Sequence, residues 1–277
     1  MVDELVGTLF GRWYVTVFGV AFAVLATRHL GWRRTLIYAA AAVGVGLVAE
    51  NGSASDLGLP YGRYEFNPDL RGDEIWVGDV PLMVALSYTF MSYFGFASAR
   101  MIVAGPWRTR SEMPVLEYLV AVLLTVWAIW IIDPVSRFGE HFFLGDLFAY
   151  EGPGFWFGLP LGSQVGFTLT SAILVGVLTW LARDEPDQPV ATAMTHPRLP
   201  AVGTYVGQVL FMTITAWWVG SARDVPEAHA LAGATFVIFL PVVLLVAVHW
   251  RHLTTIRSGR GPMLPTTPDR GQNEGGG

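Results

Sequence analysis

Two acidic residues are the first candidates for chemistry, because each directly follows a long apolar run. Glu50 follows the run 35–49, and Asp133 follows the run 115–132. Ionisable groups beside membrane-length apolar segments are costly, and they usually face a protein interior or a water-filled cavity. A buried carboxylic acid can stay protonated and donate a proton, because desolvation disfavours its charged form. A second carboxylate that stays ionised can direct a water molecule and take its proton, so the pair suits acid–base chemistry.

The lengths of these two runs argue that the acids lie below a membrane surface. Only 15 residues separate Arg34 from Glu50, and 15 separate Glu117 from Asp133. As helices these segments would cover about 22 Å, which is about 7 Å short of the hydrocarbon thickness. The plainer interpretation is that both acids are interfacial residues at helix ends, with Asp133–Pro134 acting as a helix stop.

The two acids have similar surroundings in the sequence. Each is followed by a loop of roughly 27 residues, at 51–78 and 134–160, and then by a Gly-x-(x)-Pro-Leu segment that opens the next apolar run. This loose parallel repeat predicts that both acids face one shared cavity on the outer side of the membrane. Long loops are usually functional or disordered, and the aromatic content of these two favours loops that fold back onto the helices.

The loops and their ends supply five candidate residues for a substrate-binding site. Tyr61, Tyr64 and Trp156 are expected to line an apolar pocket. Arg63 is a candidate charge partner for the acids. Asp79 precedes another apolar run, so it is either a binding residue or a helix cap that interacts favourably with the helix dipole.

Composition and apolar runs predict an all-α fold. The 277 residues are 53% hydrophobic and 14% charged, whereas soluble domains carry about 25% charged residues. Seven runs approach the roughly 20 helical residues that cross a bilayer. They are 13–27, 35–49, 80–103, 115–132, 161–182, 202–222 and 230–248. The sequence therefore predicts a polytopic transmembrane bundle of about seven helices in residues 1–257, followed by a disordered cytoplasmic tail at 258–277.

The distribution of arginine predicts the orientation of this bundle. Twelve of the 17 arginines fall after the first, third and fifth runs or in the C-terminal tail, and five fall on the other side. The positive-inside rule then favours an N-outside, C-inside arrangement. We expect a multi-pass protein of a bacterial or archaeal plasma membrane.

The residue types that are absent exclude several kinds of chemistry. The chain has no lysine, so it can form no Schiff base with retinal or pyridoxal phosphate. It has no cysteine, so thiolate and iron–sulfur chemistry are excluded. A net charge of −5 with scattered arginines predicts no nucleic-acid binding. His141, Glu140 and Asp146 lack metal-ligand spacing and are better explained as loop residues, so we expect neither a metal nor an organic cofactor.

The motifs around the two acids resemble those of the carotenoid biosynthesis protein family, which includes membrane-bound carotenoid 1′,2′-hydratases and bisanhydrobacterioruberin hydratase. The resemblance covers residues 49–167 with motifs and the remaining helices by topology. It is carried by Glu50, Leu59-Pro60-Tyr61-Gly62-Arg63-Tyr64, Gly78-x-Val80-Pro81, Asp133-Pro134 and Trp156-Phe157-Gly158-Leu159-Pro160-Leu161. Ser163 and Gly166-Phe167 stand where the family pattern has an Asn and a Gly-Trp, a difference that bears on the substrate.

The resemblance implies addition of water to the terminal double bond of an acyclic carotenoid end group, which gives a tertiary alcohol. Under this hypothesis Glu50 is the acid and Asp133 the base that directs the water, although the two roles could be exchanged. The expected partners are an apolar polyene from the bilayer, membrane lipid and other membrane enzymes of the carotenoid pathway.

Two other classes of function stay open at the level of sequence. An acid-triggered cyclase or isomerase of another polyene or polyketide would use the same acid and aromatic pocket without admitting water. A non-enzymatic transporter or lipid-binding protein is the third possibility. Transporters commonly place their binding groups near the midplane, whereas these acids lie towards one face.

Overall fold

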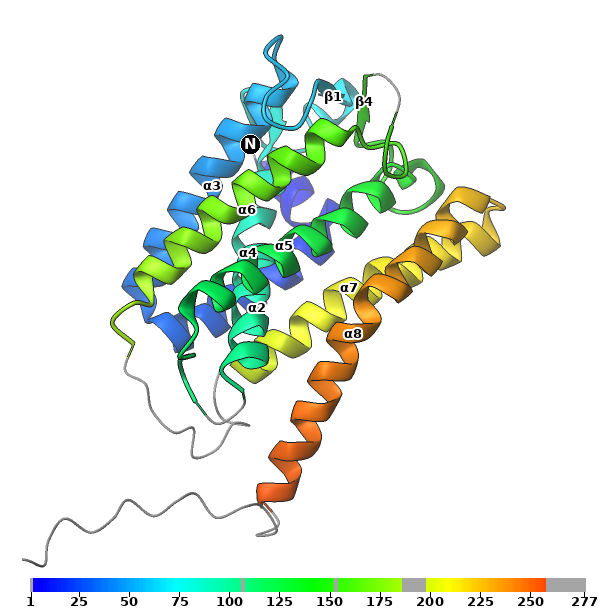
Figure 1. The fold of residues 1–277 in the computed structure, drawn as a ribbon. Coiled ribbons are helices and arrows are strands. Elements are labelled where there is room, and N and C mark those ends of the chain that lie inside the picture. The colour runs from blue at the N-terminus through cyan, green and yellow to red at the C-terminus, as the bar shows by residue number, and fades with distance from the viewer. Residues whose placement is uncertain (1, 106–107, 152–153, 186–197, 258–277) are drawn as a thin grey trace, which may run out of the picture.

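The computed structural model describes residues 2–105, 108–151, 154–185 and 198–257. Within these ranges the chain forms eight α-helices and four short strands (Figure 1). Helix α1 (Val2–Val6) is short and continues into a π-helical turn at Gly7–Gly11. The tail expected at 258–277 lies outside the described residues.

The seven remaining helices confirm the predicted all-α polytopic bundle. Each is long and apolar enough to cross a membrane, in α8 over Pro226–Leu245. They are α2 (Trp13–Leu30), α3 (Trp32–Ala54), α4 (Leu82–Val103), α5 (Pro114–Ser136), α6 (Leu161–Leu181), α7 (Arg198–Ala222) and α8 (Pro226–Arg257). The N-outside orientation remains a prediction from the arginine distribution.

Helices α3 and α5 are longer than the sequence suggested. Each has 23 residues, or about 34 Å of helix, which is enough to cross the hydrocarbon. The expected shortfall of about 7 Å was therefore wrong. Glu50 lies inside α3, and Asp133 lies inside α5, since charged residues do not by themselves end a helix.

The plainer interpretation of Asp133–Pro134 as a helix stop was also wrong, and a distant tryptophan explains why. Pro134 has no N–H group to donate to the carbonyl of Trp130, four residues earlier in α5. That carbonyl instead accepts a hydrogen bond of 2.8 Å from Nε1 of Trp156. Since the freed acceptor is satisfied, the helix continues through Pro134 to Ser136.

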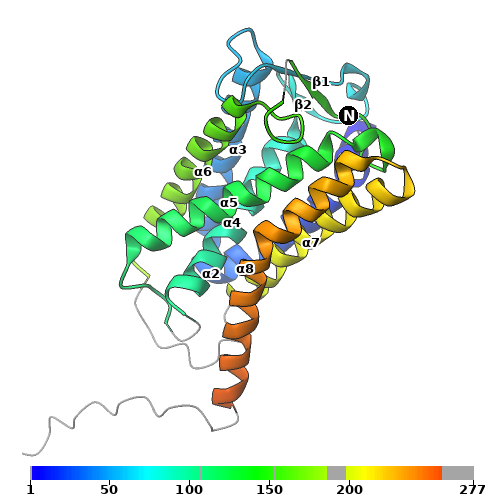
Figure 2. The same ribbon diagram turned by 45° about the vertical axis from the view of Figure 1, so that its right-hand side comes forward.

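The two long loops fold back onto the bundle, as their aromatic content predicted. Strand β1 (Tyr64–Phe66), from the first loop, pairs antiparallel with β4 (Phe148–Tyr150), from the second. Strands β2 (Trp76–Val77) and β3 (Val80–Pro81) form a second pair before α4. The loops also contain 3-10 turns at Pro68–Leu70 and Gly139–His141. The β1–β4 pair covers the end of the bundle where α2 begins (Figures 1 and 2).

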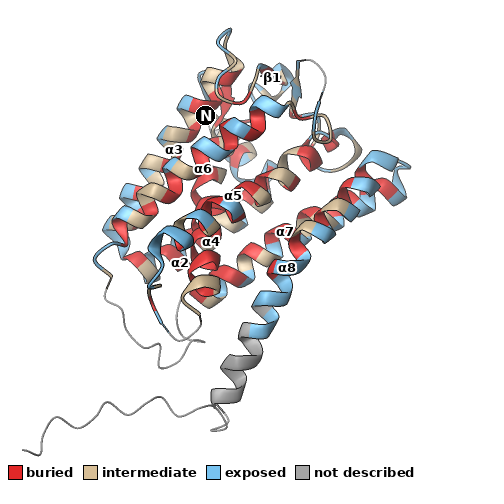
Figure 3. Cartoon of the chain, viewed as in Figure 1, coloured by how far each residue is buried: buried red, intermediate tan, exposed pale blue. Residues whose placement is uncertain are grey.

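Helix α4 is the central helix, the most buried of the seven spans. Figure 3 shows buried residues on the inward faces of the helices and exposed residues on the outward faces. Small residues let neighbouring helices approach α4 closely. Gly46 of α3 faces Tyr88 of α4, and Gly95 of α4 faces Thr125 of α5. Close packing at these glycines therefore holds α4 against α3 and α5.

A buried group of charged residues ties the helices together at the opposite end from the strands. Arg100 near the end of α4 donates a hydrogen bond of 2.7 Å to Glu117 in α5. Arg100 also pairs with Glu185, which follows α6. His29 of α2 lies 3.6 Å from the same Glu185 carboxylate. Opposite charges that are buried together stabilise one another. This cluster therefore links the ends of α2, α4 and α6 to the start of α5.

Candidate functional site

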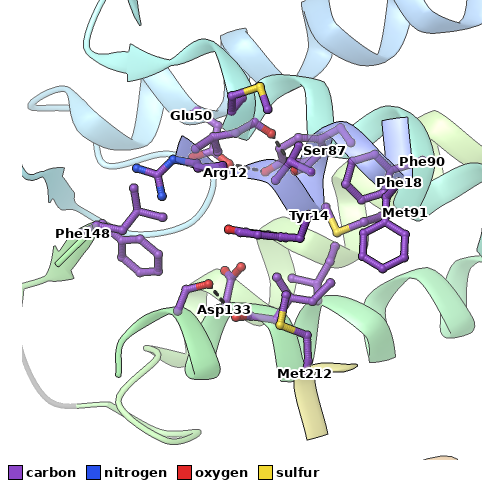
Figure 4. A pocket seen from close by; sticks show the side chains of 18 of the residues that line it. Arg12, Tyr14, Phe18, Glu50, Ser87, Phe90, Met91, Asp133, Phe148 and Met212 are labelled. Atoms are coloured by element: carbon purple, nitrogen blue, oxygen red, sulfur yellow. Dashed lines mark hydrogen bonds between the residues drawn. The ribbon is translucent and has the colours of Figure 1, made fainter. Parts of the chain in front are cut away.

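One cavity lies beneath the β1–β4 pair and is enclosed by helices α2 to α7. Its empty volume, counted to the open mouth, is about 850 Å³. Glu50 and Asp133 both line it, so the expectation that the two acids face one cavity is confirmed. Figure 4 shows them on opposite sides of the cavity, with the ring of Tyr14 between them.

The walls between the acids are mainly apolar and aromatic. Representative lining residues are Phe18, Met83, Phe90, Ile129, Phe148 and Phe167. Such a lining, with few polar groups converging on it, is typical of sites that bind small apolar molecules. Aromatic rings in the wall can also stabilise a positive charge that develops on a substrate.

Glu50 is almost enclosed, with 6% of its surface exposed. The hydroxyl group of Tyr64, on β1, donates a hydrogen bond to one carboxylate oxygen, and the hydroxyl group of Tyr88, on α4, donates to the other. The acid on α3 is thus held by one strand and one helix. Tyr64 was among the expected binding residues, whereas Tyr88 was not.

Tyr88 begins a chain of hydroxyl groups that leads away from the cavity. Its oxygen lies 3.0 Å from that of Tyr61, which lies 2.9 Å from Oγ1 of Thr170. Burial raises the pKa of Tyr61, and the charge of Glu50 raises it further, so this phenol stays neutral. Each hydroxyl group donates one proton, so the chain points towards Glu50 when the acid is ionised. It points towards Thr170 when Glu50 is protonated.

Asp133 has a different environment from Glu50. It is partly accessible and lines the cavity. Its carboxylate makes no hydrogen bond or ion pair with any residue that the structure describes. The nearby Tyr150, on β4, also lines the cavity; burial raises the pKa of Tyr150, and the charges of Asp133 and Glu50 raise it further. One acid is therefore held by phenols and the other is free to bind a ligand or water.

Two of the expected binding residues lie away from the cavity. Arg63 is exposed and pairs with Asp56 and Glu151 at 3.3 Å each, so it is not the charge partner of either acid. Asp79 is also exposed and pairs with Arg71 at 2.7 Å. Both side chains contribute to the surface of the loop region, where water satisfies them.

Asp79 does not cap α4 either. Trp156 lies behind the cavity wall and does not line the cavity. The N-cap residue of α4 is Pro81, and no side chain makes a capping hydrogen bond there. The ring of Trp156 lies against that of Trp130, tilted by 41° with ring centroids 5.9 Å apart, and Trp156 completes the hydrogen bonding of α5 beside Asp133. Tyr61 does not line the cavity either, but it bonds to Tyr88, which does.

A family model described as carotenoid biosynthesis protein matches residues 10–246. The chain belongs to the carotenoid biosynthesis protein family. The match confirms the resemblance inferred from the motifs and includes all the helices and strands that line the cavity. This carotenoid biosynthesis protein matched no curated protein and no solved structure in the two other searches.

Membership of this family indicates that the protein takes part in carotenoid biosynthesis. Among the cavity-lining residues that sequence reasoning missed are Arg12, Tyr14 and Tyr88. A signal for Arg12 was present, because it is one of only five arginines on the side that the positive-inside rule leaves poor in them. Tyr88 and Tyr14 had no such signal, since aromatic residues are ordinary in helices of this composition.

The loop residues once considered as metal ligands lie at the surface of the carotenoid biosynthesis protein. His141 pairs with Glu140 at 3.2 Å, and both side chains are accessible. Across the described ranges, no three histidine or acidic side chains come close enough together to hold a metal ion. The polar side chains that line the cavity are its acids and phenols, Arg12, Ser87, Ser136 and Gln208.

Proposed function

We propose that the protein is a hydratase that adds water to the terminal carbon–carbon double bond of an acyclic carotenoid end group. One observation carries this proposal: two carboxylates in unlike environments face the same apolar cavity in a member of the carotenoid biosynthesis family. Pairs of titratable groups whose environments differ are typical of acid and base assignments. The enclosed Glu50 is suited to donate a proton, and the unpartnered Asp133 to accept one.

The reaction would begin with protonation of the double bond. Glu50, held in place by Tyr64 and Tyr88, gives its proton to the less substituted carbon, and a new C–H bond forms from the π electrons. The positive charge is left on the tertiary carbon. Aromatic rings of the wall stabilise it by about 0.5–2 kcal/mol each.

Water capture completes the addition. A water oxygen forms the C–O bond with the tertiary carbon, while Asp133 takes one of the water protons. The product is a tertiary alcohol, and a proton must pass from Asp133 back to Glu50 before the next turnover. The net change is one added water, so no redox partner is needed.

The shape of the site suits the end of a long polyene. The cavity is open to one side and its wall is mainly apolar, so an end group could enter it while the rest of the chain lies in the membrane. The apolar substrate would arrive from the bilayer. Other membrane enzymes of the carotenoid pathway are natural partners, because substrate and product are both insoluble in water.

Replacement of the acids tests the proposal. In a host that accumulates an acyclic carotenoid, the wild type should give a pigment heavier by one water, measured by mass spectrometry. Glu50→Gln and Asp133→Asn, made separately, should each abolish that product while the protein still accumulates in the membrane. Arg63→Gln and Asp79→Asn are matched controls at exposed positions and should leave it unchanged.

The same experiment separates the alternatives. Full hydration by either acid variant would overturn the proposed roles. A pigment of unchanged mass but altered absorption would instead indicate an isomerase or cyclase. An unchanged pigment profile with the wild type would favour a transporter or lipid-binding protein.

A further inference from the structure

Among the described residues that line the cavity with the two acids, Arg12 is the one basic side chain. It is the residue directly before α2, and only 3% of its surface is exposed. Figure 4 shows it on the same side of the cavity as Glu50. Nothing in the mechanism above uses this guanidinium group. The desolvation of a buried arginine must be offset by partners.

Glu74 makes most of the interactions that offset the desolvation of Arg12. Nε of Arg12 donates to Oε2 of Glu74 at 3.1 Å, and Nη2 lies 2.8 Å from Oε1. Glu74 is itself buried, with 7% of its surface exposed. A two-point contact of this kind neutralises the charge and fixes the plane of the guanidinium group. Arg12 therefore presents a rigid, neutralised donor and not a free positive charge.

The third nitrogen of this group has no partner. Nη1 of Arg12 is buried and makes no hydrogen bond with the residues that the structure describes. The hydroxyl group of Tyr14 lies near enough to the guanidinium group to interact with it through hydrogen bonding and through charge, and it also lines the cavity. A buried donor left without an acceptor is costly, so Nη1 is expected to meet an oxygen atom in the cavity.

The chemistry of the site limits what that oxygen can be. An anionic ligand is disfavoured, because Glu74 already neutralises Arg12 and two more acids face the same space. An acyclic hydrocarbon polyene offers no acceptor. The remaining candidates are uncharged oxygens, which the proposed reaction contains in two forms: water before the addition and a tertiary hydroxyl group after it.

We propose that Nη1 of Arg12 binds the water molecule that is added to the polyene and the tertiary hydroxyl group which that water becomes. This inference rests on the proposed function and gives its water a binding site. With one lone pair held by Arg12, the second lone pair of the water can face the tertiary carbon. Arg12 would thus decide whether the cation captures water or loses a proton.

The alternative is that the Arg12–Glu74 pair only ties the start of α2 to the loop that contains Glu74. Isotope exchange in heavy water separates the two roles. A cation that forms but captures no water can lose a proton and return to the polyene, which then carries deuterium. A water-binding role therefore predicts a changed ratio of deuterated polyene to alcohol, whereas a purely structural role would lower both products together.

The test uses Arg12→Lys. Lysine keeps a positive charge beside Glu74 but lacks the planar guanidinium group, in which two nitrogens bond to Glu74 and Nη1 stays free. In membranes supplied with an acyclic carotenoid in heavy water, we expect the ratio of deuterated polyene to alcohol to rise by at least about tenfold over the wild type. Arg71→Gln is the matched control, because Arg71 pairs with exposed Asp79 away from the cavity. Its ratio should equal that of the wild type.

The results distinguish failure of this inference from failure of the proposed function. An unchanged ratio in folded Arg12→Lys overturns the inference alone. If that variant does not accumulate, the double variant Arg12→Met/Glu74→Met leaves no unpaired charge and carries the same test. Absence of both alcohol and deuterated polyene with the wild type would overturn the proposed function itself, and the inference with it.

Discussion

The hydroxyl group of Tyr64 on strand β1 donates a hydrogen bond to the carboxylate of Glu50 on helix α3. Tyr64 also faces Tyr150 across the β1–β4 pair, in register with it. The strand pair made by the two long loops is therefore part of the candidate site and not merely a cover. Any change that shifts this pair is expected to reach Glu50.

Removal of the phenol hydroxyls tests this connection. Tyr64→Phe and Tyr88→Phe keep the rings but leave Glu50 without a donor on one oxygen. We expect each to lower the rate of hydration by about tenfold or more, with little loss of protein from the membrane. Tyr118→Phe is the control, because its hydroxyl group bonds to the carbonyl of Ala172 at 3.0 Å instead. Equal rates in all three variants would contradict a role for the phenols.

Two glycines of α3 provide a packing test with a built-in comparison. A Cβ atom at Gly46 would lie 2.9 Å from the ring of Tyr88 and 3.4 Å from Cα of Ala85, whereas one at Gly44 would meet nothing within 4 Å. Gly46→Ala should displace Tyr88, lower activity and cost about 1–3 kcal/mol of stability. Gly44→Ala should be neutral or slightly stabilising. Thermal unfolding in detergent and pigment analysis would measure both, and identical behaviour would refute the close contact.

The cluster of buried charges predicts a loss of stability in acid. Burial alone would raise the pKa of Glu185, but the neighbouring His29 and the charge of Arg100 outweigh this and lower the pKa to about 2. Because the folded value lies below the usual 4.5, ionised Glu185 stabilises the fold fully above about pH 4.5, and this contribution is lost as the pH falls towards 2.

Two neighbouring substitutions can isolate this effect. Glu185→Gln should be less stable than the wild type at neutral pH and should lose less stability between pH 4.5 and 2. Asp184→Asn is the control, because the side chain of Asp184 is 65% exposed. Melting temperatures in detergent across this pH range would decide. A parallel decline in all three proteins would show that other groups cause the acid sensitivity.

The orientation of the bundle is open to a direct test. Twelve of the 17 arginines lie on the side of the C-terminal tail, so a reporter fused to the C-terminus should read as cytoplasmic. A second reporter inserted in the exposed part of the first loop, near Arg63, should read as external. The reverse pattern would place the cavity on the cytoplasmic side and change where substrate and water enter.

The sequence was informative wherever one local property decides the outcome. Long apolar runs must lie in a membrane or a core, so seven helices and their order could be predicted from run length alone. The two acids stood out for the same reason, as charges beside such runs. The repeat of acid, aromatic loop and Gly-x-(x)-Pro-Leu correctly predicted that both acids face one cavity.

The failures share one cause, which is that contacts between distant segments decide them. Helix α5 continues through Pro134 because Trp156, from the following loop, satisfies the free carbonyl of Trp130. Arg63 and Asp79 lie beside the acids in motif order, yet they point to the surface. Sequence spacing could not distinguish them from Tyr88, which bonds directly to Glu50 from another helix.

By itself, the sequence determined the membrane location, the number of spans and the pair of acids, because hydrophobicity and charge are properties of each residue. Only the tertiary structure decided which side chains surround those acids. Arg12 meets Glu74 across 62 positions of the chain, and Tyr64 meets Glu50 through a loop that must first pair with another. Hydrogen bonds act over about 3 Å, so these partners are chosen by how the helices and loops pack together.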